Sequence, residues 1–266
     1  MAVIVVDTAA AVTTASTDRS IIGFDSILPI STVSGENADT LNPFSNCLDY
    51  RDNTKYSPVI ASGTIVITFT QSATRTIDYF AFAIHNSQDA GLTGTYEVDD
   101  GAGYAVVAEF ASLANNKPFV KYFGSISTVR QKLTLNFTSK LYIGTIYTGA
   151  AVVMDRTPSL GFQPAKYASL DTVEQATTQG NNFIIGRREK KGNQAKATFR
   201  YVRFDDLDTW YNDFANHVLD SKPVFFKWSE IKDQSVYGLQ NYKTLTKPNY
   251  VTSNHADISL EINGYI

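Results

Sequence analysis

The sequence predicts a mainly β protein of two domains, and three observations lead to this prediction. The chain has 266 residues, which is enough for two ordinary domains that each bury a core. Short segments that alternate apolar and polar residues recur along it, separated by turns that contain glycine. At residues 155–159 a polar stretch with a proline interrupts this pattern. We therefore expect an N-terminal arm or first strand over 1–19, a β-sandwich or jelly roll over 20–155, and a smaller β domain over 156–266.

The first domain is predicted from strands with one or two buried faces. Residues 64–70 and 130–138 alternate, as strands with one buried face do. Residues 77–84 are denser in apolar and aromatic side chains, which is typical of a strand covered on both faces. The side chains expected to point inward are Ile65, Ile67 and Phe69 in the first strand, and Leu133, Leu135 and Phe137 in the last.

The second domain is predicted to hold a hairpin, one helix and two or three further strands. Residues 182–188 and 196–204 read as strands, and the charged segment 189–194 between them has the composition of a hairpin loop. Asp205 and Asp206 stand where a helix N-cap belongs. The apolar positions that follow at helical spacing are Leu207, Trp210, Phe214 and Val218. The helix should stop before Lys222-Pro223, and strands are expected over 224–228 and 256–262.

Charge and composition exclude several function classes. A net charge of -3 gives no basic field for phosphates, so specific nucleic-acid binding is not expected. No stretch is apolar enough to span a bilayer, and no signal peptide is visible at the start, so we expect neither membrane insertion nor export. Cys47 is the only cysteine, and we interpret it as a packing residue.

Residues that could carry chemistry do not assemble into a catalytic pattern, and the chain is not expected to be an enzyme. His85, His217 and His255 lack the spacing of a metal site, so neither a metal nor a cofactor is predicted. His217 is interpreted as a partner for the dipole at the helix C-terminus. Asp99-Asp100-Gly101 faintly resembles a calcium loop, but a hairpin turn is the simpler interpretation.

The strongest local charge feature is a basic segment formed by Arg187, Arg188, Lys190 and Lys191. A solvated hairpin explains it without any function, whereas an arm that contacts a neighbouring subunit or a nucleic acid is the functional alternative. An acidic chain with one protruding basic hairpin suits head-to-tail packing in a ring, in which each arm meets an acidic face of its neighbour.

Two parts of the chain resemble known families. Residues 42–50, 54–56, 65–69 and 77–86 together resemble the discoidin or galactose-binding-like jelly roll, and residues 142–156 look like the closing strands of such domains in phage tail proteins. The second domain, with its hairpin, helix and strand 224–228, is similar to the tail-tube-like fold of distal tail and baseplate ring proteins. The predicted fold is thus a galactose-binding-like jelly roll followed by a tail-tube-like β domain with one packed helix.

The resemblance implies a structural protein of a bacteriophage tail tip or baseplate, assembled in the cytoplasm of the bacterial host. The second domain would form a homo-oligomeric ring, for which a hexamer is a candidate size, and the jelly roll would hold fibres or touch the host. Tube, hub and fibre proteins of the tail are the implied partners. The alternative is a carbohydrate-binding module that recognises the host without forming a ring, and a hydrolase is a third class without supporting residues.

A carbohydrate site is implied for the jelly roll at the loop that holds Asp49, Tyr50, Arg51, Asp52 and Tyr56, because it combines aromatic and charged residues. A structural loop is the simpler interpretation, and a host surface glycan remains a candidate partner. The pair His85-Asn86 matches a motif position of the family and is interpreted as fixing a turn.

Overall fold

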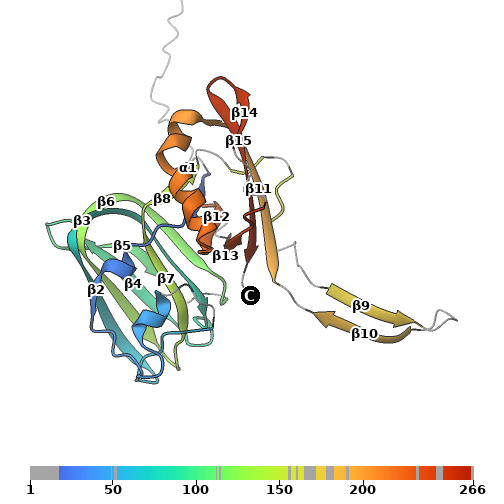
Figure 1. The fold of residues 1–266 in the computed structure, drawn as a ribbon. Coiled ribbons are helices and arrows are strands. Elements are labelled where there is room, and N and C mark those ends of the chain that lie inside the picture. The colour runs from blue at the N-terminus through green and yellow to red at the C-terminus, as the bar shows by residue number, and fades with distance from the viewer. Residues whose placement is uncertain are drawn as a thin grey trace, which may run out of the picture.

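The chain folds into two β units and a projecting two-stranded arm (Figure 1). The structure is a computed structural model. It describes residues 18–48, 50, 53–111, 113, 115–154, 157–159, 161–164, 172–177, 183–189, 192–231, 234–243 and 248–264. The mainly β fold class with a jelly-roll sandwich is confirmed. Among the described residues, no helix is long and apolar enough to cross a membrane.

The jelly roll is a six-stranded sheet that folds over on itself. Its strands run in the order β2-β3-β6-β4-β5, and β7 pairs with β3. The first half of β3 pairs with β2 and its second half with β7, and the register of β3 against β6 shifts between these halves. The long strands therefore belong to both layers of the sandwich. The bounds are β2 (Thr32–Ser34), β3 (Gly63–His85), β4 (Thr93–Asp99), β5 (Tyr104–Phe110), β6 (Phe119–Phe137) and β7 (Ile143–Gly149), with short 3-10 helices η1 (Leu28–Ile30) and η2 (Phe44–Cys47).

The core of the jelly roll follows the alternation in the sequence. All six side chains predicted to point inward are buried, with exposed fractions of 3% or less. The strand predicted to be covered on both faces is also confirmed. Phe80 and Phe82 face the jelly-roll core, whereas Tyr79 and Ala81 face a second buried cluster on the other side of β3.

The C-terminal unit is a seven-stranded sheet that recruits two strands from outside residues 156–266. Its order is β11-β15-β13-β12-β1-β8, and β14 pairs with β15. Strands β1 and β8 flank the jelly roll in sequence, yet they pair with each other and β1 pairs with β12. The whole jelly roll is therefore an insertion between two neighbouring strands of this sheet. The bounds are β1 (Ser20–Gly23), β8 (Ala151–Met154), β11 (Asn193–Arg203), β12 (Val224–Ser229), β13 (Gln234–Gln240), β14 (Asn249–Thr252) and β15 (His255–Gly264).

The helix α1 (Phe204–Leu219) packs against this sheet and shares its hydrophobic core. Leu207, Phe214 and Val218 are buried, as the helical spacing predicts, and Trp210 packs at the edge of the core. The predicted N-cap is displaced, because the capping position is Arg203 and both aspartates lie in the first turn. Their negative charges still favour the positive end of the helix dipole there.

The arm consists of β9 (Thr172–Thr177) and β10 (Phe183–Glu189), which form a sheet of their own. The prediction that residues 182–188 and 196–204 form a hairpin is therefore wrong, because these two strands do not pair with each other. Strand β10 pairs with β9, whereas β11 pairs with β15 along nearly its whole length. The apolar face of β11 is buried against the C-terminal core, and this burial outweighs the local pairing that the short charged segment suggested.

A buried aromatic joint holds the two units together. Tyr147 of the jelly roll lies 5.1 Å, between ring centroids, from Phe225 of β12, which in turn lies 4.6 Å from Tyr237. Polar contacts reinforce the joint: the ammonium group of Lys227, which is 5% exposed, donates a hydrogen bond to the carbonyl oxygen of Val120 at 3.0 Å. Because these side chains are almost fully buried, the orientation of the jelly roll on the C-terminal unit is fixed by packing.

Candidate functional site

Tyr56, one of the predicted carbohydrate ligands, is a core residue of the jelly roll. Its ring is fully buried and packs edge-on against Phe44, with ring centroids 5.1 Å apart. Its hydroxyl donates a hydrogen bond to the carbonyl oxygen of Glu36, and its backbone pairs with Ile143. Burial also raises the pKa of this phenol well above its usual value. A side chain held in this way stabilises the loop and does not face a ligand.

Tyr50, the second predicted ligand, lies at the joint between the two units. Its ring makes edge-on contacts with Tyr147 at 5.7 Å and with His217 of α1 at 6.2 Å. Its positive φ of 60° turns the chain at this point. The other predicted members of this site, Asp49, Arg51 and Asp52, lie outside the described residues. The two described members thus serve the core and the joint and do not converge on one surface.

His85 and Asn86 fix a turn, as the sequence suggested. The Nε2 atom of His85 lies 2.9 Å from the carbonyl oxygen of Lys117, and its Nδ1 atom lies 2.7 Å from the hydroxyl of Ser87. The amide of Asn86 donates to the carbonyl oxygen of Lys140 and accepts from the N–H of Tyr142. Burial lowers the pKa of His85 to about 4, so its imidazole is neutral at neutral pH.

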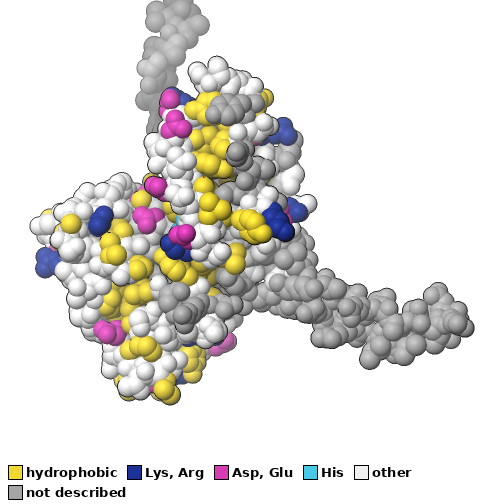
Figure 2. Space-filling view, viewed as in Figure 1, with side chains coloured by type: hydrophobic (Ala, Val, Ile, Leu, Met, Phe, Trp, Pro, Cys, Tyr) yellow, Lys and Arg dark blue, Asp and Glu magenta, His cyan; other side chains and the backbone are white. Residues whose placement is uncertain are grey.

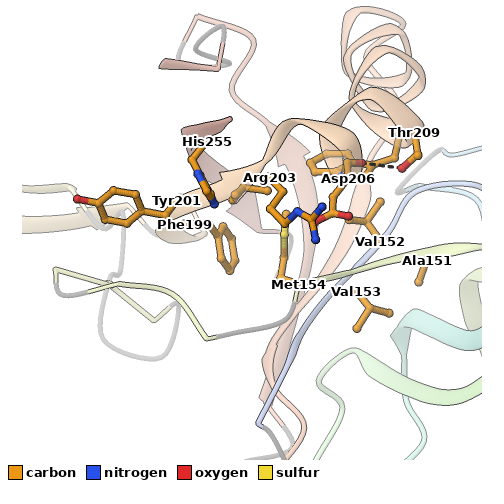
Figure 3. Close-up of a pocket in the computed structure, with 12 residues that line it drawn as sticks. Ala151, Val152, Val153, Met154, Phe199, Tyr201, Arg203, Asp206, Thr209 and His255 are labelled. Carbon is orange, nitrogen blue, oxygen red and sulfur yellow. Dashed lines mark hydrogen bonds between the residues drawn. The ribbon is translucent and has the colours of Figure 1, made fainter. Parts of the chain in front are cut away.

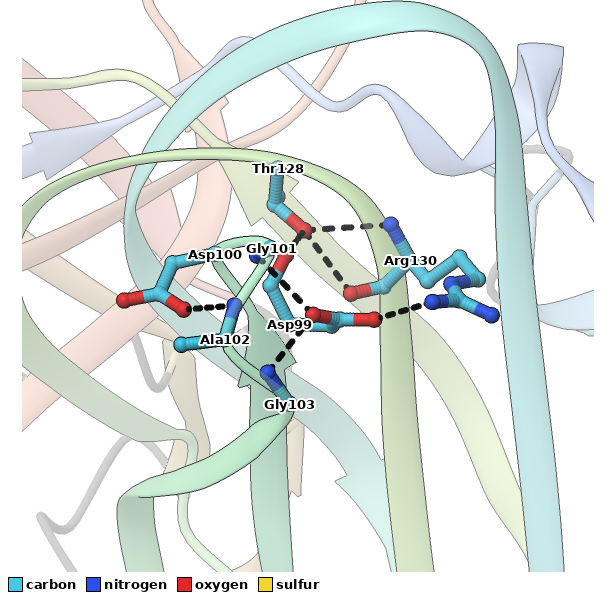
Figure 4. A network of polar contacts seen from close by, with 7 residues as sticks. All are labelled: Asp99, Asp100, Gly101, Ala102, Gly103, Thr128 and Arg130. Atoms are coloured by element: carbon cyan, nitrogen blue, oxygen red, sulfur yellow. Dashed lines mark hydrogen bonds and ion pairs between the residues drawn. The ribbon is translucent and has the colours of Figure 1, made fainter.

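The Asp99-Asp100-Gly101 segment is the hairpin turn between β4 and β5 (Figure 4). One carboxylate oxygen of Asp99 accepts hydrogen bonds from the N–H groups of Gly101 and Gly103 at 2.9 and 3.2 Å. Its other oxygen lies 2.6 Å from the guanidinium of Arg130. The bond from Gly101, more than any other contact, lowers the pKa of Asp99. One carboxylate oxygen of Asp99 is thus used within the turn and the other pairs with β6, which supports the structural interpretation over a calcium loop.

His217 and Cys47 have structural partners. The Nε2 atom of His217 lies 2.9 Å from the carbonyl oxygen of Pro223, and desolvation lowers the pKa of its imidazole. His217 does lie in the last turn of α1, and because desolvation opposes its charge the predicted dipole role stays a prediction. The buried thiol of Cys47 lies 3.2 Å from the carbonyl oxygen of Ile143, in keeping with packing. Within the described part of the chain, no three His, Cys, Asp or Glu side chains lie close enough to hold a metal ion.

A groove lies between α1 and the edge strand β8, and we call it the α1 groove. It consists of two hollows, of about 370 and 410 Å³, that share Trp210, Thr209 and the first residues of β8. Sequence reasoning missed it because its walls come from segments far apart in the chain. Figure 3 shows the first hollow, with Arg203 and Asp206 projecting between β8 and α1. Its apolar lining includes Val152, Met154 and Phe199.

The charged rim of the α1 groove is mainly acidic. Four aspartates, Asp25, Asp206, Asp213 and Asp220, line it against two cationic side chains, Arg203 and Lys222. Both cations are engaged nearby, since Arg203 pairs with Asp205 at 3.0 Å and Lys222 with Asp220 at 2.9 Å. Among the described residues, Asp206 and Asp213 have no ion-pair partner. Desolvation, the largest influence, raises the pKa of the partly buried Asp25.

The structure describes two residues of the predicted basic hairpin. Arg187 and Arg188 lie in β10, where their backbone positions face Glu174 and Val173 of β9. Lys190 and Lys191 lie outside the described residues. The structure therefore places the two arginines at the base of the arm, close to where the chain enters β11 at Asn193.

Comparisons with known proteins bear on the fold. No family model matches the chain, and no curated protein does. Solved structures that resemble it include a pectin-binding carbohydrate-binding module (17% identity, TM-score 0.38, covering 47% of this chain and 93% of that one) and a module of Clostridium perfringens, CpGH89CBM32-4 (16% identity, TM-score 0.41, covering 48% and 100%). Two longer chains, SpGH29 among them, are matched over only 28% of their length.

The strand topology defines a mainly β protein that contains a jelly-roll sandwich. With TM-scores below 0.5, these similarities do not transfer a ligand to this chain. The virion setting implied by the sequence resemblance stays a prediction.

Proposed function

We propose that this chain is a non-catalytic structural subunit that assembles with copies of itself through its arm, and that its setting is the tail tip or baseplate of a tailed bacteriophage. The observation that carries the proposal is the arm itself. Strands β9 and β10 pair only with each other among the described strands, and they project away from both cores (Figure 1).

A projecting two-stranded hairpin is a reason to expect a partner. Two strands alone are marginally stable in water, because they bury little apolar surface and leave both edges open. A neighbouring molecule that packs against the arm supplies the missing contacts. Assembly through such an arm joins two different surfaces, and a contact of this kind generates rings when the rotation closes.

The rigid joint supports the second half of the proposal, in which the jelly roll is displayed from an assembly. The buried cluster around Tyr147 and Phe225 fixes the jelly roll relative to the sheet that carries the arm. Every copy in a ring would then present its jelly roll in the same orientation. Fibres, tube and hub proteins are the partners that this arrangement suits.

The test compares the full chain with a variant in which residues 172–189 are replaced by a short Gly/Ser linker. Light scattering should show a defined oligomer for the full chain and single chains for the variant, and negative-stain images of the full chain should show rings. Since the arm forms its own sheet, the variant should keep the thermal melt of the two units. A full chain that stays monomeric at high concentration, or an arm-deleted chain that still assembles, would overturn the proposal.

A carbohydrate-binding module that recognises the host is the second candidate. The observation that favours it lies at one end of the jelly roll, where Tyr142 is 38% exposed on a loop beside Asn86. Asp89 and Asn116 lie on the adjoining loops and are hydrogen-bonded to each other. An exposed aromatic ring near amide and carboxylate groups is suitable for binding a sugar.

This candidate predicts a monomer that is retained on a glycan array. Pectin, unsaturated mannuronic acid and GalNAc-β-1,3-galactose, which are named for similar modules, are the first probes to try. Replacing Tyr142 with alanine should abolish retention if this end binds the sugar, and the exposed Val59→Ala serves as the control. Retention of a monomer without rings would favour this candidate over the structural subunit.

A further inference from the structure

We propose that the α1 groove is the surface that receives the basic base of the arm from a second copy of this chain. This inference rests on the proposed assembly through the arm and names the partner surface on the neighbouring copy. Three independent observations carry it: the segregation of charge along the chain, the distance between the arm and the groove within one copy, and the chemistry of the groove.

Charge is concentrated at these two places. Residues 204–220 hold five aspartates and no Lys or Arg, whereas four of the five residues 187–191 are Arg or Lys. The chain as a whole carries a net charge of only -3. Figure 2 shows acidic side chains along the flank of the C-terminal unit where α1 runs in Figure 1. Surfaces of opposite charge attract and orient each other during association.

Within one copy, the arm joins the sheet far from the first turn of α1. The arm joins the start of β11 at Asn193, and α1 begins directly after the end of β11 at Arg203. Ten steps along a strand separate these ends by about 33 Å. In Figure 1 the arm also points away from α1. We therefore expect an arm that contacts the Asp206 end of the α1 groove to come from another copy, and the resulting contact is head-to-tail.

The groove has the chemistry to hold an arginine-bearing strand. Asp206 and Asp213 are exposed carboxylates without an ion-pair partner in the described chain, and a guanidinium binds a carboxylate through two parallel hydrogen bonds. Trp210 lies where the two hollows meet, and arginine stacks on indole rings. The β8 side of the groove is an end of the sheet order, so it has no described partner strand on its outer side.

The experiment uses two charge-reversed full-length variants and mixes them. The groove variant carries Asp206→Lys and Asp213→Lys, and the arm variant carries Arg187→Glu and Arg188→Glu. The control variant carries Asp208→Lys and Asp100→Lys, two exposed aspartates that do not line the groove. Thermal melts first verify that all three are folded. Self-association is then measured by sedimentation and light scattering at low and at higher salt.

We expect each reversed variant alone to associate at least about tenfold more weakly than the unmodified chain, and the control to associate normally. In an equimolar mixture, the intact arm of the groove variant meets the intact groove of the arm variant, and the reversed groove with its lysines meets the reversed arm with its glutamates. Both contacts then join opposite charges, so the mixture should recover assembly that each variant has lost alone. Added salt should weaken the assembly of the unmodified chain.

The experiments distinguish a failure of this inference from a failure of the proposed function. If the arm-deleted chain fails to assemble but the groove variant assembles like the control, the arm binds elsewhere and this inference is wrong while the proposed function stands. If the arm-deleted chain assembles normally, the proposed function itself fails. A mixture of the two reversed variants that stays monomeric also counts against the groove.

Discussion

Replacing Phe225 with alanine should destabilise both units, because this ring lies in the joint between them. The side chain is fully buried, and its ring centroid lies 5.1 Å from that of Tyr147 in the jelly roll. Truncating a buried phenylalanine removes its apolar contacts and leaves a cavity, which typically costs about 3–5 kcal/mol in the free energy of unfolding. For a chain of this size we expect the melting temperature to fall by about 10 °C.

The assay combines urea unfolding with hydrogen exchange read by mass spectrometry. Exchange should accelerate in β12, which carries Phe225, and also in the Tyr79–Ala83 region of β3, which faces the joint from the jelly roll. A double-mutant cycle with Tyr147→Leu should give a coupling of about 0.5–1.5 kcal/mol, as for other aromatic pairs. The matched control is Val66→Ala, since Val66 is 43% exposed and should contribute less than about 0.5 kcal/mol. If β12 loses protection while β3 does not, the joint does not couple the units and the reasoning is refuted.

Two further predictions concern single sites. Gly238→Ala should cost about 1–3 kcal/mol, since a Cβ there would lie 2.0 Å from the carbonyl oxygen of Asn263 on the neighbouring strand; an unchanged urea midpoint would contradict this close approach. Burial raises the pKa of Asp78 from its ordinary value of 3.8 to about 6, so the folded protein retains a proton there that the unfolded chain has lost, and the ionised group costs stability above that range. Asp78→Asn keeps an acceptor for the N–H of Ala151 and removes the charge, so it should stabilise the protein more at about pH 7.5 than at about pH 4.5. Equal effects at the two pH values, measured by urea unfolding, would show that the carboxyl is not perturbed.

The features that were predicted well from sequence are those in which the residue pattern of a single strand or helix depends on which of its faces are buried. The alternation through Ile65 and Ile67 follows directly from one buried face, and the dense apolar run around Phe80 follows from two. The apolar run indicates that something covers the second face of this strand, but it does not indicate which part of the chain does so. The structure identifies it as the joint with Phe225, which a periodicity argument has no means of naming.

Pairing between distant segments was not predictable in the same way. Strands β1 and β8 have only four residues each, too few for a pattern that shows which sheet they join, and the structure pairs Ile21 with Val153 and with Lys227. The arm shows the same limit. A charged loop between two strands suggests a hairpin, but β11 can bury its apolar face only against the C-terminal core.

The candidate binding residues show that the composition of a loop can suggest a binding site without showing which way its side chains point. The loop with Tyr50 and Tyr56 has the composition of a sugar site, yet both rings turn inward, because large aromatic side chains contribute most when buried. Charged side chains differ from aromatic ones in this respect, because the aspartates of a surface helix stay exposed to solvent. The sequence could therefore suggest that a basic arm meets an acidic face. Only the fold shows that Asp206 and Asp213 of α1 line a groove against β8, and that α1 begins at the opposite end of β11 from the arm.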